Sequence, residues 1–413
     1  MRRIKYSILL LLVWIFAKVI SAPCALVMAI TVLPTDVEVA TQGHELVGIE
    51  GSFATDVQEA IDLVNQYRLE ACMNGYPNPN NPDTNLTPSD YVPIQWSSDL
   101  EYIARIRAAE ASIYESNDRP NEKDYSSLQS KNGIHSTREA LCFWSGDTMT
   151  DSIEWWYALG KEAWVNQEST ESLTYTALIA PSYTHMGMAQ ISATGAAEFI
   201  NANRLYEEKS GITLDTTPLP KAKNIMQTVE VPKSKLTNLR VRLDTNFIAG
   251  ETARVEFIYT YDKYRGVSYL GDIRWKCNSN KITLKPDGTI TAKKIGKHKI
   301  KFTYSGAKKG SFKKTITILP QTPSIKKIVT KKTSATIKFK KVPGVSGYQI
   351  HYTNYDDAYL RGGRVNVSKA KSSKTVKNLS RKNEYSFIIR SYKKVGKKTY
   401  YSAWSKEKIK RTK

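Results

Sequence analysis

Cysteine is scarce in this chain of 413 residues, which contains four of them. Cys24 lies in an apolar N-terminal segment, and only Cys72, Cys142 and Cys277 follow it, so at most one disulfide can form in the rest of the chain. Cys72 and Cys142 could pair or could remain buried thiols, because nothing local fixes the distance between them. No Cys-x-x-Cys pattern occurs, so a structural zinc site has no support. Stability is therefore expected to come from hydrophobic cores.

Motifs of common enzymes are also missing. The chain has no Gly-x-Ser-x-Gly, no His-Glu-x-x-His and no glycine-rich phosphate-binding loop, which leaves hydrolase and nucleotide-binding functions without a motif. Histidine occurs five times. His135 lies near Glu139 and is a candidate general base beside a carboxylate, because imidazole titrates near neutral pH. The alternative is a polar loop histidine, and His185, on a predicted strand, is expected to serve packing.

Charge is distributed unevenly along the chain. Residues 56–200 hold 8 basic and 21 acidic residues, a net charge of −13, whereas residues 201–413 hold 49 basic and 14 acidic residues, a net charge of +35. Lysine exceeds arginine and no nucleic-acid-binding motif occurs, so no specific nucleic-acid partner is expected. The lysines could contact anionic wall polymers or phospholipid headgroups, or they could be solvated faces. With 41% hydrophobic and 24% charged residues, the composition excludes global disorder.

The N-terminus is typical of a secretion signal. Arg2, Arg3 and Lys5 precede an apolar run over residues 8–17, which matches a signal's charged and apolar regions. Cleavage after Ala29 would define residues 1–29 as the signal and would place the protein outside the cell or at its surface. The alternative is an uncleaved anchor that extends to residue 33, in which Lys18 at mid-span would be costly; membrane attachment is expected only in that case.

The acidic half alternates between helical and irregular stretches. Apolar residues spaced by three and four predict helices that begin near residues 56 and 98, and a third over 151–166. The Asn- and Pro-rich stretch 74–93 predicts an irregular loop, and residues 186–206 predict a pair of strands.

The basic half has a different pattern. Residues 206–235 mix turn formers with charge and predict a linker. Beyond them, short segments that alternate with period two predict two β-sandwiches, over 236–319 and 321–413, with a break between Pro320 and Pro323.

Four stretches within residues 54–205 resemble the CAP superfamily of cysteine-rich secretory, antigen 5 and pathogenesis-related proteins, in its bacterial secreted form. The order and the spacing of these stretches agree with that family. They are DLVNQYR from Asp62, PIQWSSDLEYIARIRAAE from Pro93, SNDRPNEKDY from Ser116 and YTALIAPSYTHMGMA from Tyr175. The resemblance implies a multidomain protein with an α/β CAP domain, an α-β-α sandwich, before the two all-β sandwiches.

Members of this family often carry a cleft with two histidines and two acidic residues that could hold a divalent metal. In this chain Asn117 and Thr174 stand where the histidines are expected, whereas Glu139 and Asp151 match the acidic pair. The resemblance therefore implies a degenerate ligand-binding cleft at these four positions. No cofactor is expected, and a residual divalent cation on the two carboxylates is the alternative, since Asn and Thr contribute only neutral oxygen ligands.

The two basic modules also resemble known families. The stretch DIRWKCNSNKITLKPDGTITAKKIGKHKIKF resembles bacterial immunoglobulin-like domains, with Trp275 as the buried residue between the sheets. Residues 321–413 resemble fibronectin type III domains. Leu379 and Tyr385 are placed as in the tyrosine corner of such folds, and Phe339 replaces the usual Trp. The order of the modules suggests a Gram-positive bacterium.

These observations predict a secreted or cell-surface protein in which a degenerate CAP domain acts as a binding module and basic β-sandwiches hold it at an anionic envelope. The expected partners are anionic wall polymers, surface proteins or glycans. One alternative is an extracellular or wall hydrolase that uses Glu139, Asp151 and His135. The other is a carrier of a small lipid or sterol, whose support is a cluster of four tryptophans, at positions 144, 155, 156 and 164.

Overall fold

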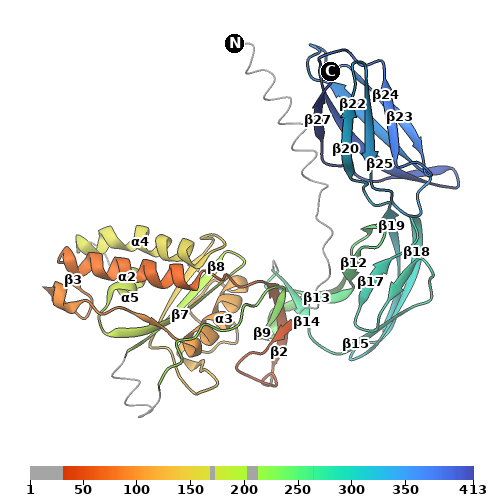
Figure 1. Cartoon of the computed structure of the whole chain (residues 1–413). Helices are drawn as coiled ribbons and strands as arrows, with labels where there is room; N and C mark the ends of the chain where they lie inside the picture. The colour runs from red at the N-terminus through yellow and green to blue at the C-terminus, as the bar shows by residue number, and fades with distance from the viewer. Residues whose placement is uncertain (1–30, 168–172, 202–212, 264) are drawn as a thin grey trace. The chain divides into compact units, whose positions relative to one another are not determined.

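The computed structural model describes residues 31–167, 173–201, 213–263 and 265–413 (Figure 1). The signal expected at residues 1–29 lies outside these ranges. The described residues form two compact units: the first holds those up to 241 together with 257–270, and the second holds 242–256 and 271–413. In the part of the chain that the structure describes, no helix combines the length and the apolar character that a membrane span requires.

The part of the first unit that resembles the CAP family, called the CAP body below, is an α-β-α sandwich. Its central sheet has the strand order β5-β7-β8-β6. One face of this sheet packs in a common core with α2, α4 and α5, and α3 covers the other face (Figure 1). The elements are α2 (Val57–Met73), β5 (Gln95–Trp96), α3 (Ser98–Ile113), β6 (Arg138–Phe143), α4 (Met149–Val165), α5 (Leu173–Ile179), β7 (Tyr183–Ile191) and β8 (Thr194–Asn201).

Local sequence explains most of these elements. Ser97 caps α3, because its hydroxyl accepts a hydrogen bond from the backbone N–H of Leu100. The predicted helices agree with α2, α3 and α4 to within two residues. The predicted strand pair, residues 186–206, covers β8 and all but the first three residues of β7, and its residues 202–206 lie outside the described ranges. The stretch predicted as an irregular loop contains only short elements, namely β3 (Pro77–Asn78), β4 (Asn81–Asn85) and η1 (Pro88–Asp90).

A second sheet in the first unit, with the order β1-β9-β2-β14-β13-β10, was not expected. It corrects the predicted linker 206–235, because residues 225–232 form β9 and all eight are buried. β2 pairs with β9 along its whole length. The strands are β1 (Thr31–Leu33), β2 (His44–Gly51), β9 (Ile225–Pro232), β10 (Leu236–Arg242), β13 (Glu256–Tyr261) and β14 (Arg265–Tyr269). Residues 31–33, which the uncleaved-anchor alternative includes, therefore lie in a strand.

The second sheet packs against the helix α3. A shared core joins Ala109 of α3 to Val47 of β2 and Val229 of β9, so that α3 is covered on two sides. Eleven of its sixteen residues are buried, including charged ones. The buried charges described below are a consequence of this arrangement.

The second unit consists of two β-sandwiches. In the first, the sheets β11-β19-β18-β15 and β12-β17-β16 enclose Trp275, which is 3% exposed. Its predicted range, 236–319, is corrected, because β10, β13 and β14 belong to the first unit. The strands are β11 (Asn246–Ile248), β12 (Thr252–Arg254), β15 (Ile273–Cys277), β16 (Ile282–Leu284), β17 (Thr289–Ala292), β18 (Gly296–Gly306) and β19 (Gly310–Leu319).

The second sandwich has sheets of three and five strands, β20-β21-β24 and β23-β22-β25-β26 with β27 beside β25. The backbone N–H of Ser380 donates a 2.9 Å hydrogen bond to the Tyr385 hydroxyl, as the tyrosine corner predicts. The strands are β20 (Ile325–Thr330), β21 (Ser334–Phe339), β22 (Gly347–Asn354), β23 (Gly362–Ser368), β24 (Ser373–Lys377), β25 (Glu384–Val395), β26 (Lys398–Tyr401) and β27 (Lys408–Arg411).

Candidate functional site

Glu139, the first of the two predicted cleft carboxylates, lies on β6 and is bound by an arginine. The guanidinium of Arg107, on α3, donates through Nη2 to Glu139 Oε1 at 2.9 Å and through Nε to Oε2. The Glu139 side chain is 2% exposed and that of Arg107 is fully buried. Burial raises the pKa of Glu139, and the hydrogen bonds and the charge of Arg107 oppose this rise. Both carboxylate oxygens are thus engaged within the protein.

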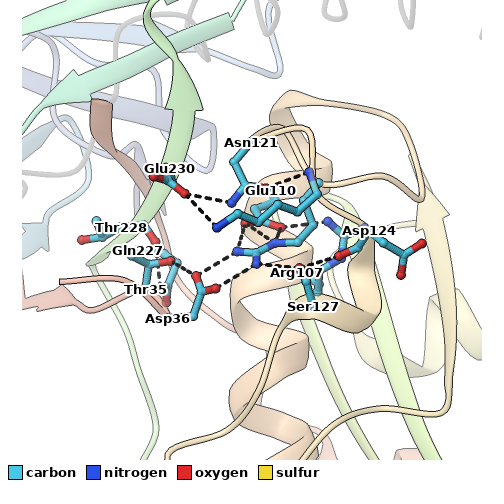
Figure 2. Close-up of polar contacts among 12 residues, drawn as sticks. Thr35, Asp36, Arg107, Glu110, Asn121, Asp124, Ser127, Gln227, Thr228 and Glu230 are labelled. Carbon is cyan, nitrogen blue, oxygen red and sulfur yellow. Dashed lines mark hydrogen bonds and ion pairs between the residues drawn. The ribbon is translucent and has the colours of Figure 1, made fainter. Parts of the chain in front are cut away.

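The same arginine begins a chain of buried ion pairs. Arg107 also pairs with Glu110, and Glu110 pairs with Arg119, both at 2.8 Å. Arg119 in turn donates to both carboxylate oxygens of Asp36 at 2.8 Å, in the segment after β1. Figure 2 shows Glu110 and Arg107 on the CAP side of this network and Asp36 on the side of the second sheet. The network therefore fastens α3 to the segment that carries β1 and β2.

The acidic residues of the network raise the pKa of its two arginines. Burial alone would lower the pKa of Arg107, but hydrogen bonds and charges from Glu139 and Glu110 raise it above the ordinary value. Arg119 behaves in the same way, with Glu110 and Asp36 as its partners. A network in which every charge has a buried partner is a structural element of the fold rather than a set of free ligands.

A second buried carboxylate faces Glu139. Glu198 lies directly across from it in the register of β6 and β8 and is fully buried. Burial, followed by the charge of Glu139, raises the pKa of Glu198 well above its ordinary value. Glu139, whose carboxylate Arg107 binds, therefore opposes the ionisation of Glu198 across the strand pair.

Asp151, the other predicted cleft carboxylate, caps a helix. Its carboxylate accepts a 2.9 Å hydrogen bond from the backbone N–H of Thr148, and its own N–H donates to the Thr148 hydroxyl. This is a capping box at the start of α4. The hydrogen bonds with Thr148 lower the pKa of Asp151. Asp56 supports the same helix end from the start of α2, by accepting from the N–H groups of Met149 and Thr150.

The positions predicted to replace the family histidines contribute little polar chemistry. Asn117 is exposed, and its backbone carbonyl accepts a hydrogen bond from Arg107 at 2.9 Å. Thr174 is half-buried near the start of α5. Among the described residues, no group of three or more His, Cys, Asp and Glu side chains is placed to hold a metal ion. The divalent metal that the family resemblance suggests does not fit this donor set, because Arg107 occupies Glu139 and Asp151 serves a helix cap.

The structure does not join His135 to Glu139. His135 is half-buried, and its Nδ1 donates to the backbone carbonyl of Ser126 at 3.1 Å, whereas Glu139 is bound by Arg107. His185, on β7, is also half-buried, and burial lowers its pKa. Cys72 and Cys142, for which a disulfide was one alternative, are buried free thiols.

The four tryptophans of the predicted aromatic cluster do not share one surface. Trp156 is 2% exposed and belongs to the core, while Trp155 and Trp144 are 48% and 67% exposed. Trp164 packs against the same core as Trp156 and donates its indole N–H to the Pro77 carbonyl. Trp144 instead lies under the guanidinium of Arg265. Two of the four tryptophans, Trp156 and Trp164, are therefore packing residues of α4.

Sequence reasoning identified Glu139 and missed its partners. Arg119 and Asn121 stand in the family-like segment Arg119-Pro-Asn121, and both enter the buried network, Asn121 by donating to Glu230 of β9. Their place in that family-like segment is the feature of the sequence that could have identified Arg119 and Asn121. Arg107 had a signal in its spacing of three from Glu110, but its contact with Glu139, 32 residues away, depends on tertiary structure.

A comparison with models of known protein families finds a match within the CAP body. Residues 61–199 match the model of "CAP: Cysteine-rich secretory protein family". No curated protein matches the chain.

Several solved structures resemble parts of the chain. They include a two-domain fibronectin type III segment from chicken tenascin, with 17% identity over 43% of this chain and 99% of that one and a TM-score of 0.29. A fibronectin domain of human contactin 1 has 20% identity over 22% of this chain and 77% of that one, with a TM-score of 0.20. TM-scores this low establish no shared fold by themselves, and the sandwich architecture rests on the strand order given above.

Proposed function

We propose that this protein acts outside the cell as an interaction protein, with a CAP body that binds a partner and basic β-sandwiches that hold it at an anionic envelope. The observation that carries the proposal is the bidentate contact between Arg107 and Glu139. A carboxylate neutralised in this way is not available as a general base, a nucleophile or a metal ligand. The CAP body then offers its surface rather than a reaction centre.

The basic half supports attachment to an anionic surface. Residues 201–413 carry a net charge of +35, and the cores of the two sandwiches are filled by apolar side chains, so that the lysines lie largely on the outside. Binding to a polyanion releases its condensed counterions, so an array of lysines favours contact with wall polymers. The resemblance of the first sandwich to bacterial immunoglobulin-like domains, and the signal expected at residues 1–29, agree with a protein at the surface of a Gram-positive cell.

The test is retention of the protein, residues 30–413, on purified Gram-positive cell walls, before and after the anionic polymers have been stripped from them. We expect retention on intact walls to fall steeply between 50 and about 500 mM salt, because phosphate contacts are lost with counterion competition. Stripped walls should retain little protein. Equal retention on both wall preparations would refute attachment through anionic polymers.

The lipid-carrier alternative is favoured by one pocket of 320 Å³ beside α3. Leu33, Ile106 and Ile225 contribute apolar side chains, and Lys221 contributes a cation, as an anionic amphiphile would need. Displacement of a fluorescent fatty acid from the protein tests this second candidate. An Ile106→Trp variant should abolish the signal if the pocket holds the ligand, and unchanged binding in the variant would exclude this pocket.

A further inference from the structure

A pocket of 720 Å³ in the second unit lies between the two β-sandwiches. The turn between β17 and β18 lines one side, and the end of β25 with the turn at Pro343 lines the other. The two sandwiches meet beside it, since a Cβ added at Gly296 would lie 3.8 Å from a Val395 methyl. Gln321, between the sandwiches, also donates a 2.8 Å hydrogen bond to the Ala249 carbonyl.

Positive charge is concentrated in this pocket. Five lysines and one histidine line it, and the described lining residues include no Asp, Glu, Trp, Tyr or Phe. Lysines on both sandwiches thus face one space without a carboxylate among the lining residues. The lysines are Lys281, Lys293, Lys294, Lys393 and Lys394, and the histidine is His298.

Backbone hydrogen bonds fix the lysine-bearing segments. The N–H groups of Lys293 and Lys294 both donate to the Lys281 carbonyl, at 2.9 and 3.1 Å, which brings three lysines together. The ring of His298 donates through Nε2 to the Lys294 carbonyl at 2.7 Å. On the other sandwich, the N–H of Lys394 donates to the Ser346 hydroxyl at 3.0 Å. The fold therefore fixes the backbone positions from which these lysines project.

Converging like charges repel one another unless an anion lies between them. We propose that this pocket binds consecutive phosphates of a phosphodiester polymer of the cell envelope. The proposal rests on the proposed function and names the site at which the envelope polymer is held. Ammonium groups bind phosphate as point charges, without the geometric demands of a guanidinium.

The lining favours an envelope polymer over nucleic acid. Proteins that hold single-stranded nucleic acid stack its bases on aromatic side chains, and the described lining offers no Trp, Tyr or Phe for this purpose. Small apolar residues lie among the lysines, with Ala249, Ala292 and Val395 as examples. They suit the short aliphatic or sugar unit between two phosphates.

The experiment measures fluorescence anisotropy of a labelled glycerol phosphate oligomer upon addition of the protein, residues 30–413, at several salt concentrations. The pocket variant combines Lys281→Gln, Lys294→Gln and Lys393→Gln. The matched control combines Lys301→Gln, Lys313→Gln and Lys338→Gln, which removes the same charge from exposed positions outside the pocket on the same two sandwiches. We expect the Kd to rise about tenfold or more in the pocket variant and less than about threefold in the control, since clustered phosphate contacts dominate affinity.

Equal weakening in both variants would overturn the pocket and leave a diffuse basic surface, with the proposed function intact. No binding of the oligomer by the unmodified protein would overturn the pocket, and the wall-retention experiment would then decide the proposed function separately. Preferential displacement of the oligomer by oligothymidylate would overturn the assignment to an envelope polymer. Circular dichroism of both variants verifies that each remains folded.

Discussion

Glu198 is buried directly opposite Glu139, and its raised pKa has a consequence for stability. The pKa of Glu198 is raised above the ordinary value of 4.5, so the folded state binds a proton more tightly than the unfolded state does. Its contribution to stability is therefore present at low pH and is lost as the pH rises above about 4.5. Glu198→Gln, which mimics the protonated form, should flatten this decline. Urea unfolding between pH 4.5 and 8 measures the slope, and an unchanged slope would contradict the raised pKa of Glu198.

Arg107 is predicted to be the most sensitive residue of the buried network. Arg107→Met leaves Glu139 and Glu110 buried without their cation, so we expect a loss of about 3–5 kcal/mol in the free energy of unfolding at pH 7. The loss should shrink at pH 5, where the carboxyl groups can take up protons. Arg265→Gln is the control, because its exposed pair with Glu115 should contribute less than about 1 kcal/mol. Similar losses in the two variants would contradict a special role for Arg107.

At the scale of elements, the contact of α3 with the CAP sheet depends on a glycine. A Cβ at Gly187 of β7 would lie 2.0 Å from the backbone nitrogen of Glu101 and 2.3 Å from the carbonyl carbon of Leu100. Gly187→Ala must push α3 away from the sheet, and we expect a loss of about 3 kcal/mol or more in urea unfolding. Gly266→Ala on β14 is the matched control, since a Cβ there meets nothing within 4 Å. A neutral Gly187→Ala variant would show that α3 shifts freely.

The elements also show what the sequence could predict. Helix positions follow from local periodicity and capping, which is why α2, α3 and α4 appear where the spacing places them. The second sheet depends instead on pairing between β2 and β9, about 180 residues apart, and no local pattern reports such a partner. Prediction of the candidate site from sequence is limited in the same way, because its contacts join residues far apart in the chain. The family resemblance pointed to Glu139, whereas its neutralisation by Arg107 depends on how α3 meets β6.

At the scale of the whole molecule, the boundary between the two units does not follow the chain order. β13 and β14 come after β11 and β12 in the sequence, yet they complete the sheet of the first unit. Tyr261 and Val267 from these strands are about 2% exposed or less and share a core with Val47 of β2. A fragment that ends at residue 235, the predicted end of the linker, lacks these strands. The core that they share with β2 and β9 is then exposed to solvent.

We therefore compare two fragments, residues 30–235 and residues 30–270. Burying Tyr261 and Val267 contributes about 1.5–3 kcal/mol each, so the shorter fragment should melt at least about 6 °C lower. Thermal unfolding by circular dichroism measures the difference, with the first transition of residues 30–413 as the reference for the longer fragment. Equal melting temperatures would mean that β13 and β14 contact the first unit without stabilising it. A difference of the expected size would make residue 270 the boundary at which the CAP body and its second sheet can be separated from the sandwiches.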